Sequence, residues 1–213
     1  PILPPARTRG PTRGRRRAAR RCARAGACSR RTVEPVSEMT DARAGWLPHE
    51  DLEQARDRVP MVYVDAFPVR VDDRGVVTSV GLLLRAMPDG SISRAPVSGR
   101  VQYGERVRDA LVRHLEKDLG PMALPQLPAA PQPFTIAEYF PDPTVTGYHD
   151  PRQHAVSLAF VVPVTGDCVP STDALDLQWM TPEEAAGEGV AVEMTGGQDR
   201  LLRLALAHVG VLP

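Results

Sequence analysis

Hydrophobic and polar positions along the chain predict a protein with more strands than helices. We expect β-strands in five stretches that are rich in β-branched and aromatic residues: 61–71, 76–86, 134–140, 154–164 and 175–180. Turn residues at 72–75 and 87–91 separate the first strands, and a polar loop at 141–153 precedes the fourth. Five prolines within 121–133 indicate a connector without regular structure.

Helical signals occur at three further places. The pattern over 47–59 predicts a short helix that Pro60 ends. Thr181 and Glu184 have capping-box spacing, which predicts a helix start directly after the last strand. An apolar stripe over 197–209 predicts a final helix. This order of elements indicates a single α/β or α+β domain with helices packed on a sheet.

The segment 98–121 predicts a loop that leads into a helix, which ends at Leu119 with Gly120 as its C-cap. At about 100° per residue, one face carries an apolar stripe formed by Val107, Leu111 and Leu115. Asp109 and Arg113 lie on the opposite face, where an i,i+4 ion pair is expected.

Three ionisable side chains of this helix fall on or beside the apolar face. His114 and Asp118 project into it one turn apart, and Lys117 lies at its boundary. Titratable groups that face a sheet must be paired, hydrated or functional. The residues alone leave two interpretations open, namely a satisfied buried His–Asp pair and a functional site.

Charge is distributed unevenly along a chain whose net charge is zero. Residues 1–33 contain eleven arginines and no acidic residue, whereas the remainder holds 15 basic and 26 acidic residues. We expect residues 1–38 to be disordered, because they offer too few large apolar side chains to offset the ordering entropy. Two readings of this tail stay open: a basic arm that contacts nucleic acid or anionic lipid, and a coding start assigned upstream of Met39.

The cysteines and the apolar runs indicate the cellular compartment in which the protein is expected. Cys22, Cys28 and Cys168 show neither a disulfide framework nor metal-ligand spacing. The longest apolar run, residues 155–164, is about half of a membrane span. We therefore expect a cytoplasmic protein that does not contact a membrane. Nucleic acid would be contacted only through the arginine-rich tail, because the rest of the chain is acidic. An oligomer is compatible with the sequence.

Residues 99–120 resemble a known motif. In the Nudix superfamily it reads G-x5-E-x7-R-E-U-x-E-E-x-G-U, where U is a bulky apolar residue. Here Gly99, Glu105, Arg113, Leu115 and Gly120 occupy matching positions. The resemblance covers about residues 61–210 and implies an α/β fold, the Nudix-type α/β/α sandwich with a mixed β-sheet. The domain plan is then a tail (1–38), a helical lead-in (39–60) and a Nudix-like domain (61–213).

The departures from this motif concern its metal ligands. Three glutamates of the family hold Mg²⁺ or Mn²⁺ on the diphosphate of the substrate, and here those positions are His114, Lys117 and Asp118. A lysine ammonium has no acceptor atom and cannot ligate a cation, and imidazole is a poor ligand for magnesium. The resemblance therefore implies Asp118 as the remaining metal ligand, for Mg or Mn, and as a catalytic candidate with Glu105 and Arg113. Lys117 and His114 become candidates for binding the substrate.

The loop before the fourth strand offers further candidates. Asp150, Arg152 and His154 lie in or beside "YHDPRQH", in the region that closes over the nucleotide in Nudix proteins. Arg152 could bind a phosphate with two hydrogen bonds, and Asp150 and His154 could contact the substrate. The structural alternative is that Arg152 pairs with Asp150 in a turn.

The resemblance implies two functions. The first is a pyrophosphohydrolase with an altered, impaired metal site that acts on a nucleoside diphosphate linked to another moiety. The second is a non-catalytic module that binds a nucleotide or a phosphorylated metabolite, such as a sensor. The sequence leaves open whether the protein is an enzyme, and a nucleotide-type small molecule is the expected partner in both cases.

Overall fold

The computed structural model describes residues 47–87, 90–170 and 174–212. The predicted tail over 1–38 and the first part of the lead-in lie outside the described residues. Among the described residues, no helix combines the length and the apolar character that crossing a bilayer requires.

A mixed β-sheet forms the centre of the domain. Its strands are β1 (Met61–Val71), β2 (Val77–Ala86), β3 (Ile92–Ala95), β4 (Val97–Arg100), β5 (Thr135–Tyr139), β6 (Ala155–Pro163) and β7 (Asp176–Met180). The main order is β3-β2-β1-β6-β5, while β4 also pairs with β1 and β7 with β2. β1 and β6 are parallel and the other pairs are antiparallel. This arrangement places β1 in the middle, where its neighbours cover both of its edges.

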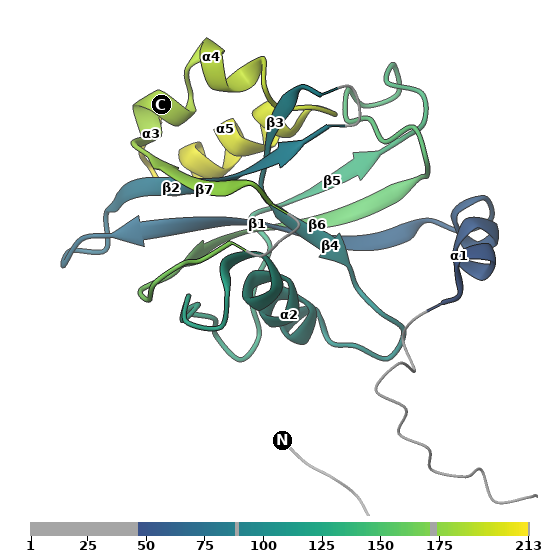
Figure 1. Ribbon diagram of the computed structural model, residues 1–213, viewed down its shortest axis with the longest axis horizontal. Coiled ribbons are helices and arrows are strands. Elements are labelled where there is room, and N and C mark those ends of the chain that lie inside the picture. Colours follow the sequence, from purple (N-terminus) through teal and green to yellow (C-terminus); the bar gives the residue numbers. More distant parts are fainter. Residues whose placement is uncertain (1–46, 88–89, 171–173, 213) are drawn as a thin grey trace, which may run out of the picture. The chain divides into compact units, whose positions relative to one another are not determined.

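Helices cover both faces of this sheet. They are α1 (His49–Arg56), α2 (Val107–Leu119), α3 (Pro182–Ala185), α4 (Glu188–Ala191) and α5 (Gln198–His208). Figure 1 shows α2 on one side of the sheet and α3, α4 and α5 on the other. The α/β/α sandwich with a mixed sheet is therefore confirmed.

The alternation of side chains along β1 creates a core on each face. Val64 and Ala66 point to one face and pack in a buried cluster with Leu111 of α2. Phe67 points to the other face and packs in a second cluster with Leu201 of α5. Because the two faces are separated by the sheet, a residue's position along β1 decides which helix it meets.

The five predicted strands and the final helix are found with ends that differ by no more than one residue, whereas the helix predicted over 47–59 is shorter at both ends and spans His49–Arg56. The capping box is confirmed, since Thr181 Oγ1 accepts from the Glu184 amide at 3.3 Å and Glu184 Oε2 accepts from the Thr181 amide at 2.9 Å. The expected loop at 98–100 is wrong, because these residues belong to β4 and pair with β1. β3, β4 and α4 have four residues each, too few for a periodic pattern to be recognised.

Candidate functional site

The start of α2 is held by an ion pair between Arg113 of the helix and Glu105 of the loop before it. Arg113 Nε and Nη2 donate to the two carboxylate oxygens of Glu105, each at 2.7 Å. Arg113 Nη2 also donates to the Arg100 carbonyl at 3.0 Å, and the Gln102 amide donates to Glu105 at 2.9 Å. The hydrogen bonds from Arg113 lower the pKa of Glu105. Glu105 and Arg113 thus join the loop, β4 and α2, which is a structural arrangement.

The expected pair between Asp109 and Arg113 is wrong. Asp109 accepts two hydrogen bonds from Arg106 instead, at 2.8 and 3.0 Å, in an exposed i,i+3 pair. Glu105 is more buried than Asp109 and offers Arg113 both oxygens in a fixed loop, so the longer-range pair prevails.

His114 is wedged between α2 and β4. Its Nε2 lies 3.1 Å from the Arg100 carbonyl, to which it donates because a carbonyl oxygen carries no proton. A Cβ atom built on Gly99 would lie 1.8 Å from His114 Cε1, so the ring packs directly on the glycine backbone. Burial lowers the pKa of His114 and favours the neutral imidazole. The ring therefore fills space and satisfies a carbonyl at this position.

Asp118 is matched by two cations. Its side chain is only 1% exposed, and Arg85 Nη2 of β2 donates to Oδ2 at 3.1 Å. Lys117 Nζ donates to Oδ1 at 3.4 Å, while the lysine side chain remains 50% exposed. A buried carboxylate without a partner is strongly unfavourable, and here Arg85 and Lys117 supply the positive charge.

These residues do not fit a divalent metal ion. Both oxygens of Asp118 already accept hydrogen bonds from cationic groups, which would also repel a metal ion. His114 is committed to a carbonyl oxygen, and Lys117 offers no lone pair in its protonated state. Within the described residues, no group of three or more His, Cys, Asp or Glu side chains is arranged to hold a metal.

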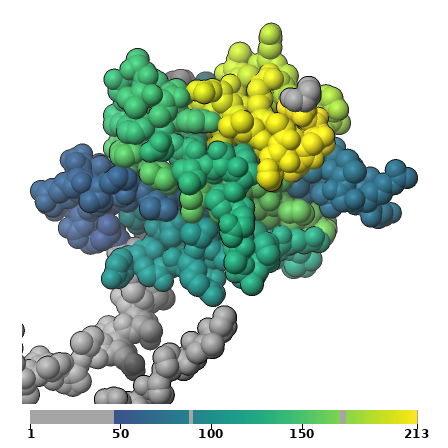
Figure 2. All heavy atoms as spheres, turned by 180° about the vertical axis from the view of Figure 1, so that it is seen from behind, coloured from purple at the N-terminus to yellow at the C-terminus, as the bar shows by residue number. Residues whose placement is uncertain are grey.

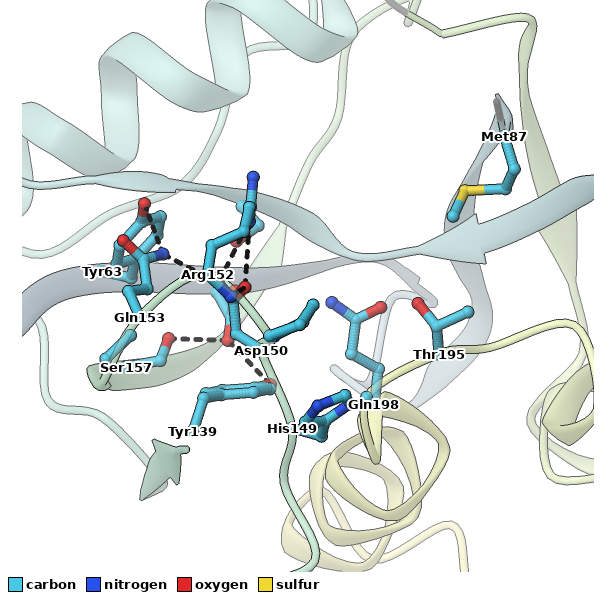
Figure 3. A pocket seen from close by; sticks show the side chains of 15 residues that line it. Tyr63, Met87, Tyr139, His149, Asp150, Arg152, Gln153, Ser157, Thr195 and Gln198 are labelled. Atoms are coloured by element: carbon cyan, nitrogen blue, oxygen red, sulfur yellow. Dashed lines mark hydrogen bonds and ion pairs between the residues drawn. The ribbon is translucent and has the colours of Figure 1, made fainter. Parts of the chain in front are cut away.

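A pocket of about 390 Å³ lies on the opposite face of the sheet, on the side of α5 (Figure 3). It is bounded by β1, β4, β5 and β6, by the loop 149–153 and by residues 195–198 before and at the start of α5. Asp150 and Arg152 line this pocket. The motif candidates do not line it; they are Glu105, Arg113, His114, Lys117 and Asp118. The sequence-predicted candidates therefore fall into two groups, on different faces of the sheet.

One wall of the pocket is a network around Gln153, which is 2% exposed. Gln153 Nε2 donates to the Tyr63 hydroxyl at 2.9 Å and to Asp150 Oδ2 at 2.8 Å. Its Oε1 accepts from Arg56 of α1 at 3.1 Å, so the lead-in helix supports the wall. Arg152 binds Asp150 with two hydrogen bonds at 2.9 and 3.0 Å and remains largely exposed at the rim. The turn interpretation of this pair is thus what the structure contains.

The carboxyl groups of the pocket are in different electrostatic states. Burial would raise the pKa of Asp150, but hydrogen bonds from Arg152 and Gln153 outweigh it and lower this pKa. Asp65 of β1 is 3% exposed, and burial raises its pKa although Ser157, Ser98 and Tyr139 donate hydrogen bonds to it. Asp65 is therefore hydrogen-bonded by neutral hydroxyl groups, whereas Asp150 is paired with a cationic arginine.

The loop that carries the pocket wall is fastened to α5. The His149 amide donates to the Gly196 carbonyl at 3.1 Å, and Arg200 Nη1 donates to the Thr146 carbonyl at 3.2 Å. The Arg200 guanidinium also lies 5.1 Å from the ring centre of Tyr148. Figure 2 shows this green segment against the yellow helix. The wall is therefore positioned by the fold rather than by the loop alone.

Two further residues complete the comparison with the sequence predictions. His154 stacks on Phe140 with ring centres 4.3 Å apart, and it does not line the pocket. Sequence reasoning missed Arg85 and Asp65. A single acidic residue inside the apolar strand "MVYVDAFPV" was the available signal for Asp65. Nothing in the sequence connects Arg85 to Asp118, which lies 33 positions away.

Comparison with known proteins assigns the chain to a family. Residues 42–211 match the family model described as "Domain of unknown function (DUF4916)". A solved structure from Jonesia denitrificans DSM 20603, described as a "possible asymmetric diadenosine tetraphosphate (Ap4A) hydrolase", is 64% identical. The match covers 73% of this chain and 98% of that chain, with a TM-score of 0.72. No curated protein matches the chain.

More distant solved structures share the fold. A Nudix hydrolase from Nitrosomonas europaea is 14% identical over 73% of this chain and 93% of that chain, with a TM-score of 0.53. The Nudix domain of Shewanella oneidensis NrtR, solved with ADP ribose, is 14% identical over 80% and 99%, with a TM-score of 0.51. Nudix hydrolases generally use divalent metals such as Mg or Mn. The chain belongs to the DUF4916 family, and its fold is the Nudix fold.

Proposed function

We propose that the protein binds a nucleotide-type ligand, a nucleoside diphosphate joined to another group, without metal-dependent hydrolysis of it. The observation that carries this proposal is the state of Asp118, whose two oxygens accept hydrogen bonds from Arg85 and Lys117. Splitting a phosphoanhydride requires neutralised phosphate charge and an oriented water, which divalent metals provide in Nudix enzymes. Because cationic side chains occupy both oxygens of Asp118, this carboxylate is not available to a metal ion, which disfavours hydrolysis.

The pocket in Figure 3 is the proposed ligand site. Its volume of about 390 Å³ suits part of a nucleotide, and its lining combines aromatic side chains with hydrogen-bonding groups. Arg152 contributes a largely exposed guanidinium at the rim, where a phosphate could contact the edge that Asp150 leaves open. Lys117 is a second candidate phosphate contact, on the α2 face, because its side chain is half exposed.

The named relatives support the ligand class. The Jonesia denitrificans protein is described as a possible hydrolase of diadenosine tetraphosphate, and the Shewanella oneidensis domain was solved with ADP ribose. Both molecules contain a nucleoside joined through phosphates to another group. They are therefore suitable probes for this chain.

Isothermal titration calorimetry with ADP-ribose and with Ap4A tests this proposal. We expect saturable binding in EDTA, the same affinity within about twofold in Mg²⁺, and no hydrolysis product by chromatography after prolonged incubation. Arg152→Ala should weaken binding, whereas Arg106→Ala, which removes an exposed arginine outside the pocket, should not. Binding that requires metal, or the absence of any binding, would contradict the proposal.

A second candidate function is metal-dependent hydrolysis, which the description of the 64% identical relative favours. The Glu105–Arg113 pair at the start of α2 is also retained. Turnover of Ap4A in Mn²⁺ by the wild-type protein, abolished in Asp118→Asn, would establish this function. The double variant His114→Glu with Lys117→Glu separates the two candidate functions. Only a protein that lacks metal-binding carboxylates should gain turnover when these two glutamates are introduced.

A further inference from the structure

A buried acidic group forms the floor of the pocket. Asp65 Oδ2 accepts from Ser157 Oγ at 2.6 Å and from the Tyr139 hydroxyl at 3.4 Å. Ser98, which pairs with Asp65 across β1 and β4, is its third hydroxyl partner. Among the described residues, no lysine, arginine or histidine forms an ion pair with this carboxyl group.

The hydrogen-bonding capacity of Asp65 exceeds what the protein uses. A carboxyl group in its ionised form can accept about four hydrogen bonds, and three hydroxyl groups occupy three of these positions. The residue lines the pocket, so a ligand can reach the remaining position. Because burial without a cation disfavours the ionised form, a ligand group that donates a hydrogen bond would be stabilising here.

The walls beside Asp65 suit a flat ring. Tyr63 and Tyr139 contribute aromatic side chains to the pocket that Asp65 also lines, and Met87 contributes a flexible apolar side chain (Figure 3). A heterocycle between such walls would direct its edge at the floor. The chemistry of the floor then decides which edges are accepted.

We propose that Asp65 accepts a hydrogen bond from an amino group on the edge of a purine ring, and so determines which nucleobase the pocket selects. This inference rests on the proposed binding of a nucleotide and adds the identity of the group that is recognised. A ring that presents only acceptors to the floor leaves the fourth acceptor position of the carboxyl group unfilled and binds more weakly.

Titration calorimetry with two ligands and three proteins tests the assignment. The ligands are ADP and purine riboside 5′-diphosphate, which carries hydrogen in place of the 6-amino group. For the wild type we expect ADP to bind about tenfold more tightly, the effect of about one hydrogen bond. Asp65→Asn keeps an acceptor oxygen and should retain most of this preference, whereas Asp65→Leu should reduce it to below about twofold.

Asp150→Asn is the matched control, because Asp150 lines the same pocket but is paired with Arg152. It should change the affinities of both ligands by the same factor. If Asp65→Leu does not fold, as judged by thermal unfolding, Asp65→Ser takes its place. Equal affinities of the wild type for the two ligands would overturn the role of Asp65 alone, and so would a preference that survives in Asp65→Leu. No binding of either ligand would overturn the proposed function as well.

Discussion

Asp118 shows how neighbouring cationic side chains determine the chemistry of a helix face. The carboxylate is nearly inaccessible to water, and its charge is balanced by Arg85 from β2 and Lys117 from its own helix. In this position a lysine does what a metal ion would do for charge, but it cannot orient a water molecule for attack. The stability of the protein should therefore depend on these cations.

Removal of Arg85 tests this dependence. Arg85→Met should lower the free energy of unfolding by about 2 kcal/mol or more, because Asp118 would keep only the half-exposed Lys117 as a cationic partner. Adding Asp118→Leu should recover most of the loss, since a buried ion pair replaced by apolar groups is often neutral. Urea unfolding of the single and double variants measures both values, and additive losses would speak against the pairing.

Asp65 makes a prediction about pH. Burial raises its pKa in the folded state above the value of an unfolded chain, so the folded state holds this proton more tightly and loses stability as pH rises. Asp65→Asn has no ionisable group at this position, and the difference in Tm between variant and wild type should therefore increase as pH rises above the ordinary aspartate pKa of 3.8. Tyr139, Tyr63, His149, Asp150 and Arg152 are the other ionisable groups of the pocket, and they are shared by both proteins. A difference in Tm that stays constant or decreases with pH would be inconsistent with the buried carboxyl group.

At the scale of the element, α2 is fixed by contacts that reach beyond the helix. It has no side-chain N-cap, and the pair of Glu105 with Arg113 joins it to the preceding loop and to β4 instead. At the other end Gly120, with φ of 83°, closes the helix through a hydrogen bond to the Glu116 carbonyl. The retained residues of the motif thus have a structural role even without a metal.

A matched pair of arginines measures this role. Arg113→Lys removes the two-pronged contact with Glu105 and should lower stability by about 1 to 2 kcal/mol, because this pair is partly buried. Arg106→Lys alters a similar two-pronged contact with Asp109 that is exposed, and its effect should be much smaller than that of Arg113→Lys. Chemical unfolding of both variants gives the comparison, and equal effects would exclude a special contribution from Arg113.

The packing of α2 on β4 makes a second prediction at this scale. Gly99→Ala would place a methyl group within 1.8 Å of the His114 ring and should destabilise the protein by about 1 to 3 kcal/mol. In a His114→Ala background the same change should have little effect, because the ring is absent. Gly189→Ala, where nothing lies within 4 Å of the added atom, is the control. The contact would be refuted if Gly99→Ala were equally harmful in both backgrounds, measured as changes in Tm.

The elements that the sequence predicted correctly are those with long periodic patterns. β1 and β6 have nine or more residues, and α2 combines an apolar stripe with a glycine at its end. β3 and β4 could not be predicted, because four residues carry no clear alternation. Placement of Lys117 and Asp118 on the helix followed from periodicity, but their partner Arg85 depends on how β2 lies beneath α2, which is a tertiary feature.

On the scale of the whole molecule, the two faces of the sheet differ in their chemistry. The α2 face holds the motif, and there Asp118 is paired with Arg85 and Lys117 while His114 binds the Arg100 carbonyl. The α5 face holds the pocket and the acidic floor, and its residues come from four strands and two loops. The sequence resemblance directed attention to the first face, because a motif is local. The sequence named Asp150 and Arg152, which line the pocket, but it could not bring Asp65 and Gln153 together, because they are 88 positions apart in the chain.

A direct measurement of metal binding tests whether the α2 face is a metal site or whether function resides in the pocket on the α5 face. Electron paramagnetic resonance of free Mn²⁺, titrated with the wild-type protein at neutral pH, should show no saturable binding up to millimolar concentrations, because Arg85 and Lys117 already neutralise Asp118. The variant His114→Glu with Lys117→Glu, which restores two carboxylates, should take up more Mn²⁺ than the wild type. Stoichiometric binding of Mn²⁺ by the wild type at micromolar concentrations, lost in Asp118→Asn, would contradict the proposed metal-independent site.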